Sequence, residues 1–137
     1  MIDDPAEIES LTNRIIGCAI EVHRTLGPGL LESVYQECLL IELSDAGLKV
    51  DSGRRITVEY KGRHIQGILE LDLLVESCII VELKAVERMH PVYLAQVITY
   101  LKLTGCPAGL VMNFNTTSLR AGLRRVDHPD RYVRKHV

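Results

Sequence analysis

The stretch from Gly67 to Val86 limits the possible folds most, because charged residues interrupt two runs of strand-forming residues there. Leu, Ile and Val dominate both runs, and the second is apolar enough for a central strand buried on both faces. The interrupting residues are Asp72, Glu82 and Lys84. A buried, unpaired carboxylate costs several kcal/mol, so such groups are normally neutralised, ion-paired or bound to a metal.

The spacing of these charges predicts that they share one face of a sheet. Side chains alternate across a strand, so Glu82 and Lys84 point the same way. If residues 76–78 form the loop of a hairpin, Asp72 pairs with Glu82. Two carboxylates from neighbouring strands suit Mg²⁺, which keeps several waters, and a lysine beside it can orient a water. A buried Glu82–Lys84 ion pair is an equally good interpretation of these residues.

The D-x9-E-x-K pattern formed by Asp72, Glu82 and Lys84 resembles that of the PD-(D/E)xK nuclease superfamily. The resemblance implies a divalent metal, Mg²⁺ or Mn²⁺, held by Asp72 and Glu82, with the carbonyl of Leu83 as a further ligand. It also implies that Lys84 positions the attacking water. Leu71 stands where the superfamily pattern has proline, a position that varies widely among its members.

A second motif, G-x-x-E-x-x-Y, runs from Gly29 to Tyr35 and resembles the signature of the bacterial and archaeal GxxExxY proteins. The resemblance covers nearly the whole chain, including EVHRTLGPGLLESVYQECL, IIVELKAVE, AQVITYLKLTG and GLVMNFN. It implies that Glu32 completes the metal site and acts in catalysis. An ordinary first-turn glutamate, stabilised by the helix dipole, is the alternative interpretation of Glu32.

Gln96 and Tyr100 are four residues apart in a predicted helix and therefore share a face. Their Q-x-x-x-Y spacing resembles that of RecB-like nucleases. The resemblance implies that Gln96 holds the catalytic Lys84 and that Tyr100 faces the substrate. A buried glutamine needs a polar partner, which favours this assignment, whereas Tyr100 alone is more typical of a core residue.

Hydrophobic periodicity predicts an α/β domain covering residues 1–137. Two helices, 6–26 and 30–46, form a helical hairpin, and strands 54–60 and 63–75 lead into the hairpin described above as a three-stranded antiparallel meander. A crossover helix over 91–103 then precedes a fourth strand over 109–114. Residues 119–126 are predicted as a short helix or an edge strand, and the residues after 129 as partly disordered. This is the PD-(D/E)xK nuclease-like core.

Basic residues fall in two groups, although the net charge is −2. Residues 120–137 hold six basic and two acidic residues, and Arg54, Arg55, Lys61 and Arg63 form the second group. They could follow a phosphate backbone, with Arg54 and Arg55 as substrate-binding candidates, or form a solvated face. No apolar run is long enough to cross a membrane, and the acidic amino terminus predicts a cytoplasmic protein. The four scattered cysteines are predicted to be buried thiols.

The leading functional prediction is a metal-dependent nuclease that hydrolyses phosphodiester bonds of nucleic acid, DNA rather than RNA. Its competitor is a non-catalytic nucleic-acid-binding or scaffold protein that retains the fold, because fold does not establish function. A homodimer, or a subunit whose cleft a partner chain completes, is a third possibility. Membrane association is not expected.

Overall fold

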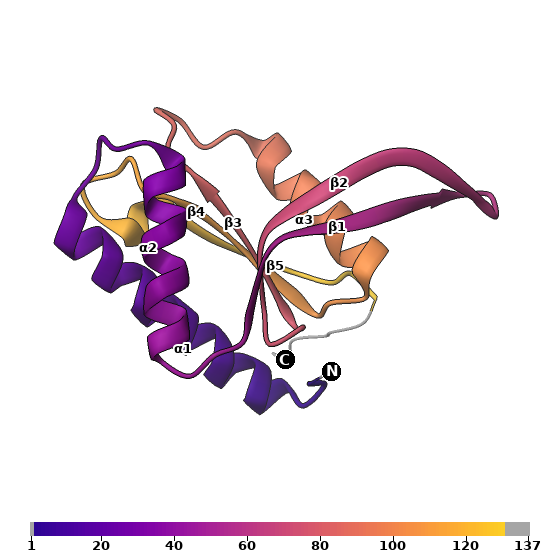
Figure 1. The fold of residues 1–137 in the computed structure, drawn as a ribbon, viewed down its shortest axis with the longest axis horizontal. Helices are drawn as coiled ribbons and strands as arrows, with labels where there is room; N and C mark the ends of the chain where they lie inside the picture. Colours follow the sequence, from indigo (N-terminus) through magenta and orange to yellow (C-terminus); the bar gives the residue numbers. More distant parts are fainter. Residues whose placement is uncertain (1, 131–137) are drawn as a thin grey trace.

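The computed structural model describes residues 2–130, apart from the side chains of residues 66–68 (Figure 1). In chain order the elements are α1 (Pro5–Leu26), α2 (Glu32–Asp45), β1 (Val50–Tyr60), β2 (Arg63–Val75), β3 (Ile79–Lys84), α3 (Pro91–Thr104), β4 (Ala108–Asn113), the 3₁₀ helix η1 (Leu119–Gly122) and β5 (Leu123–Asp127). None of the described helices is long and apolar enough to cross a bilayer.

The five strands form one sheet in the order β1-β2-β3-β4-β5. All neighbours are antiparallel except β3 and β4, which the crossover helix α3 connects in parallel. The predicted α/β fold is therefore confirmed. The segment predicted as either a short helix or an edge strand contains both, η1 followed by the edge strand β5.

Two element boundaries differ from the sequence prediction by more than one residue. Strand β1 begins at Val50, four residues early, because Val50 and Ser52 pair with Val75 and Leu73 of β2. Tertiary pairing outweighs the weak strand preference of Asp, Ser and Gly there. Helix α2 begins at Glu32, two residues late, and the preceding Leu30 donates its N–H to a side chain, the Tyr35 hydroxyl (3.1 Å).

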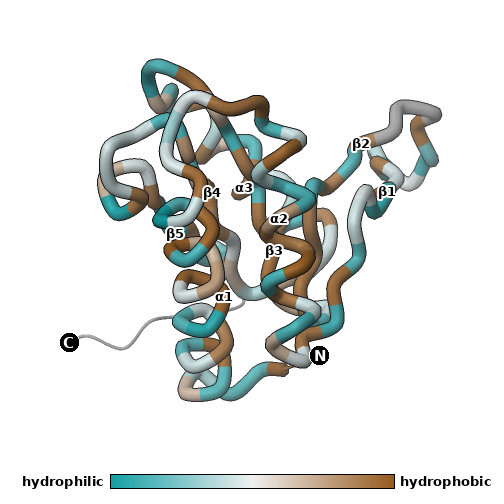
Figure 2. Tube along the Cα trace, turned by 60° about the vertical axis from the view of Figure 1, so that its left-hand side comes forward, coloured by the Kyte–Doolittle hydropathy of each residue, from teal (hydrophilic) through white to brown (hydrophobic). Residues whose placement is uncertain are grey.

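Two hydrophobic layers cover the sheet, and strand alternation separates them. Ile79, Val81 and Leu83 of β3 pack with α1 and α2, whereas Ile80 packs with α3. Figure 2 shows β3 and β4 as hydrophobic segments in the middle of the molecule. Because Glu82 and Lys84 follow the parity of Ile80, they belong to the α3 side of the sheet.

The tyrosine of the G-x-x-E-x-x-Y motif is structural. Tyr35 is fully buried and stacks on Phe114 with ring centroids 4.7 Å apart. Its hydroxyl donates to the carbonyl of Gly27 (2.5 Å) and accepts from the N–H of Leu30 (3.1 Å). Tyr35 thus ties the α1–α2 loop to the start of α2, and this fixes the turn that carries Glu32.

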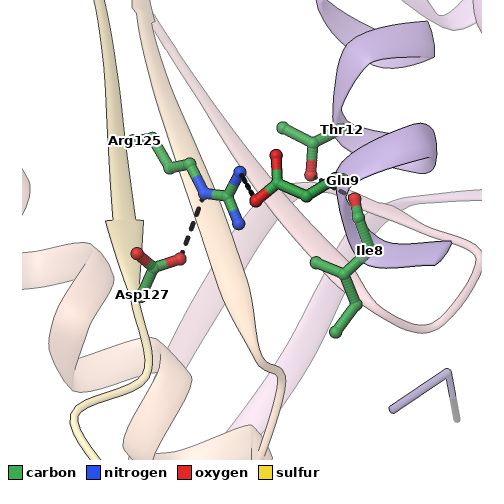
Figure 3. A network of polar contacts seen from close by, with 5 residues as sticks. All are labelled: Ile8, Glu9, Thr12, Arg125 and Asp127. Atoms are coloured by element: carbon green, nitrogen blue, oxygen red, sulfur yellow. Dashed lines mark hydrogen bonds and ion pairs between the residues drawn. The ribbon is translucent and has the colours of Figure 1, made fainter. Parts of the chain in front are cut away.

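The carboxyl-terminal basic group is only partly available to a ligand (Figure 3). Arg125 of β5 is 15% exposed and forms ion pairs with Glu9 of α1 (2.8 Å) and Asp127 (3.1 Å). Burial alone would lower the pKa of Arg125, but the two carboxylates outweigh burial and raise it. Arg125 therefore holds β5 to α1. The group's residues 131, 134 and 135 lie outside the described part of the chain.

All four cysteines carry thiols rather than disulfides. Cys78 and Cys106 are buried, as predicted, whereas Cys18 and Cys38 are only half-buried. The expectation of full burial is wrong for these two: both pack against the core from one side, and the Cys18 thiol faces the carbonyl of Glu42 across the contact between α1 and α2 (3.8 Å).

Candidate active site

The β2–β3 hairpin has the register that the sequence predicts. Its ladder pairs Val75 with Ile79 and Leu73 with Val81 across the loop formed by residues 76–78. One step further in this register places Asp72 opposite Glu82. The two carboxylates therefore lie on one face of adjacent antiparallel strands.

The two strands separate at this step, and the carboxylates fill the gap. The ladder ends at Leu73–Val81. Beyond it, the N–H of Asp72 donates to Glu82 Oε1 (3.2 Å), and the N–H of Leu83 donates to Asp72 Oδ2 (2.9 Å). Each side chain thus replaces a lost backbone partner. On the other side of β2, the position opposite Asp72 is Gly53, whose φ of 72° is in the left-handed region.

The two carboxyl groups also interact directly. Glu82 is 6% exposed, and burial, the charge of Asp72 and a hydrogen bond to the Asp72 side chain raise the pKa of Glu82 to about 9. The N–H of Asp72 and the charge of Lys84 counteract this rise without cancelling it. At neutral pH Glu82 therefore keeps its proton, because burial and the neighbouring carboxylate both disfavour its ionised form.

Helix α2 contributes two residues on one face, Glu32 and Gln36. Burial and then the charge of Asp72 raise the pKa of Glu32, while the charge of Lys84 lowers it. The Gln36 amide donates to the main-chain carbonyl of Asp72 (3.3 Å). The charges of Glu32 and Asp72 therefore interact, and the role of Glu32 in a metal site stays a prediction. Sequence reasoning missed Gln36, although its spacing of four from Glu32 could have indicated it.

Lys84 approaches the aromatic face of Tyr93 on α3, with Nζ 4.5 Å from the ring centroid. In the described part of the chain, Lys84 makes no ion pair within 4.0 Å. The backbone beside it is firmly held: the N–H of Phe114 donates to the Lys84 carbonyl (2.9 Å), and the Asn113 amide donates to the Val86 carbonyl (2.9 Å). Tyr93 was also missed, since an aromatic in the first turn of an apolar helix carries no distinctive signal.

The sequence of residues 9–126 matches the family model of the PD-(D/E)XK nuclease superfamily, which covers most of the chain. The chain belongs to this superfamily. Searches of curated proteins and of solved structures gave no significant match. Membership indicates a nuclease, and the narrower resemblance to the GxxExxY proteins stays a prediction.

Two predicted site residues on α3 of this PD-(D/E)XK domain have different surroundings. Tyr100 is 6% exposed in the core beneath the carboxylates, and burial, then Glu82, then Asp72 raise the pKa of its hydroxyl. Gln96, in contrast, is exposed and makes no side-chain hydrogen bond to any described residue. The expectation that Gln96 is buried is wrong, because the rotation of α3 directs Val97 and Tyr100 onto the sheet instead.

The candidate substrate-binding residues Arg54 and Arg55 are exposed on β1. Arg54 pairs with Leu71, one residue from Asp72, and forms an exposed ion pair with Asp51 (3.3 Å). Its side chain borders a cavity of about 240 Å³ on the α3 side of the sheet. Both arginines therefore lie within a few residues of the carboxylate pair along the β1–β2 hairpin.

The donor set fits a divalent cation of the superfamily's kind. Among the described residues, no three His, Cys, Asp or Glu side chains converge into a ready-made cage. Mg²⁺ does not require one, since one or two carboxylates with waters and substrate phosphate suffice. Asp72 and Glu82 are two hard oxygen donors whose mutual repulsion a cation would relieve, and the charge of Glu32 adds to the same negative region.

Proposed function

We propose that the protein is a Mg²⁺- or Mn²⁺-dependent nuclease that hydrolyses phosphodiester bonds of nucleic acid. One observation carries the proposal: Asp72 and Glu82 meet in a gap between β2 and β3, each bonded to the other strand. Two carboxylates buried side by side weaken the fold unless a bound ligand such as a cation neutralises them, so such pairs are typical of functional sites. Membership of the nuclease superfamily supports the same chemistry.

In this proposal Asp72 and Glu82 hold the cation, assisted by Glu32 and the carbonyl of Leu83. When bound, the cation lowers the pKa of water and neutralises charge on the phosphate, which contributes several kcal/mol of barrier reduction. The side-chain amide of Gln36 donates to the main-chain carbonyl of Asp72 and keeps the main chain there in place. Tyr35 does the same for Glu32 by fixing the start of α2.

Lys84 orients the attacking water for in-line displacement at phosphorus. Its ammonium rests on the Tyr93 ring, so Tyr93 takes the positioning role that the sequence had assigned to Gln96. A cation over an aromatic face is attracted by about 0.5–1 kcal/mol at a partly exposed site. That is enough to hold the lysine near the carboxylates while leaving it free to contact water.

Cleavage of labelled single- and double-stranded DNA and RNA in the presence of Mg²⁺ or Mn²⁺ tests the proposal. We expect Lys84→Ala to lose at least a hundredfold in turnover while keeping most of its binding, because Lys84 acts on the water rather than on the bound phosphate. Lys102→Ala, an exposed lysine on α3, is the matched control and should cleave like the wild type. A wild type that binds but cuts no substrate would instead make the protein a binding module.

A further inference from the structure

The β1–β2 hairpin projects from the sheet as a free two-stranded ribbon, here called the arm and defined as residues 54–70. Strand β2 pairs with β3 only at Leu73, Leu74 and Val75, so the arm pairs with nothing beyond its own two strands. Figures 1 and 2 show it extending away from the rest of the molecule. Near its root, Ile56 and Leu69 pack against the core on the α3 side of the sheet. An isolated hairpin is only marginally stable in water, so a partner that covered the outer part of the arm would stabilise it.

The exposed side chains of the arm suit an anionic partner. Arg54, Arg55, Lys61 and Arg63 are all exposed, against two acidic residues, in a chain whose net charge is −2. At the tip, Tyr60 is 60% exposed and Ile65 is 43% exposed. The ammonium of Lys61 lies 5.4 Å from the Tyr60 ring centroid. Basic and apolar groups together are typical of a surface that contacts both phosphates and bases.

The dimensions of the arm select among nucleic acids. Two paired strands are about 4.8 Å apart, and the part of β1 from Arg54 to Tyr60 is about 23 Å long. The B-DNA major groove, about 12 Å wide, admits a two-stranded ribbon. The major groove of A-form RNA is too deep and narrow for side chains to read. Lys61 and Gly62 have φ values of 49° and 77°, so the turn is tight and the tip adds little width.

The root of the arm coincides with the candidate active site. Gly53 in β1 and Asp72 in β2 are opposite each other where the arm leaves the sheet. A duplex that holds the arm in its groove therefore has its sugar-phosphate backbone near the Asp72–Glu82 pair.

We propose that the arm enters the major groove of double-stranded DNA and presents one strand to the carboxylate site. This inference rests on the proposed function for the role of that site. The groove contact itself needs no catalysis, so it can be measured with the cation removed by a chelator.

Fluorescence anisotropy in chelator compares a 25-base-pair DNA duplex with an RNA duplex and a single strand of the same sequence. We expect the DNA duplex to bind most tightly. The variant Lys61→Ala/Arg63→Ala should weaken that binding at least tenfold. The slope of the logarithm of the binding constant against the logarithm of the salt concentration should become shallower by about 1.8, the value for two lost phosphate contacts. Lys49→Ala/Lys102→Ala removes the same charge outside the arm and should change affinity less than twofold. Arg55→Ala is a second arm variant, expected to show a smaller loss of the same kind.

A second DNA duplex carries bulky substituents at C5 of its pyrimidines, which project into the major groove and would block the arm. We expect the wild type to bind this duplex at least tenfold more weakly than the unmodified one. Unchanged binding to that duplex, or an equal loss in the control variant, would overturn the inference. So would a sedimentation experiment in which the arm variant dissociates a dimer without losing DNA affinity, because the arm would then bind a second copy of the chain. Cleavage of a short single strand that survives in the arm variant leaves the nuclease proposal intact in either case.

Discussion

Two groups of charged side chains lie within this fold, and they are built on opposite principles. In the first, Arg125 lies between the carboxylates of Glu9 and Asp127 and joins β5 to α1. In the second, Asp72 and Glu82 meet each other where β2 and β3 separate. Both carboxylates of the first group lie within 3.1 Å of the Arg125 guanidinium, whereas Lys84 beside the second group rests on the Tyr93 ring, with Nζ 4.5 Å from the ring centroid.

This difference assigns the Arg125 group to stability and the Asp72–Glu82 group to function. Opposite charges in partly buried places offset their desolvation through direct contact, as the raised pKa of Arg125 indicates. Like charges do the reverse, and at Glu82 burial and then the charge of Asp72 raise the pKa to about 9. A fold retains such a penalty where a ligand removes it, which is why we place the site at the second group.

The largest effect should come from removing the central cation of the first group. Arg125→Met removes the guanidinium that Glu9 and Asp127 both contact, and we expect a loss of about 3 kcal/mol in the free energy of unfolding. Urea denaturation measures it. Arg24→Ala, which breaks the exposed pair with Glu21 on α1, is the control and should cost less than about 0.5 kcal/mol. Equal losses in the two variants would show that the Arg125 group has no special role.

The second group should make the metal-free protein less stable as pH rises. The pKa of Glu82 is raised from 4.5 in the unfolded chain to about 9 in the folded protein. Between these two pH values the folded protein therefore holds a proton that the unfolded chain has already released. The free energy of unfolding therefore falls through this window, by up to about 1.4 kcal/mol per pH unit.

Glu82→Gln isolates this dependence. Between pH 6 and pH 8 we expect the wild type to lose about 2 kcal/mol more than the variant, as measured by urea denaturation in chelator. All other ionisable groups are the same in the two proteins and cancel in the comparison. Parallel pH curves for the two proteins would mean that Glu82 is ionised in the folded state, and the contrast between the two groups would disappear.

The smallest effect concerns the contact of Lys84 with Tyr93. Tyr93→Leu keeps the apolar volume but removes the ring face, so we expect a three- to fivefold loss in turnover with unchanged substrate binding, which corresponds to about 0.5–1 kcal/mol. Gln96→Ala serves as its control, because Gln96 is exposed and should lose less than twofold. If Gln96→Ala costs more than Tyr93→Leu, Gln96 rather than Tyr93 positions the lysine.

The sequence predicted the parts of the site that depend on local register. The loop at residues 76–78 fixes the pairing of β2 with β3, so Asp72 and Glu82 could be placed together before any coordinates. The same holds for Glu32, whose position follows from a loop and a helix start. Alternation and helical spacing are short-range rules, and these residues obey them.

Longer-range packing decided what the sequence could not show. The partner of Arg125 is Glu9, at the other end of the chain, and no local pattern connects them. The rotation of α3 on the sheet exposes Gln96 and brings Tyr93 to Lys84, although hydropathy allows other rotations of so apolar a helix. The β2–β3 ladder ends at Leu73, where the side chains of Asp72 and Glu82 take over the contacts between the strands, and no local pattern marks that end.

The most direct test of the account is thermal unfolding of the protein with and without Mg²⁺ or Mn²⁺. A cation that binds only the folded state stabilises it by about 2.7 kcal/mol at a hundred times its Kd, which corresponds to a rise in Tm of several degrees. We predict this rise for the wild type and for Glu9→Gln, whose altered carboxylate belongs to the Arg125 group, and no rise for Asp72→Asn. A rise of equal size in Asp72→Asn would contradict the account, because the cation would then bind away from the Asp72–Glu82 pair.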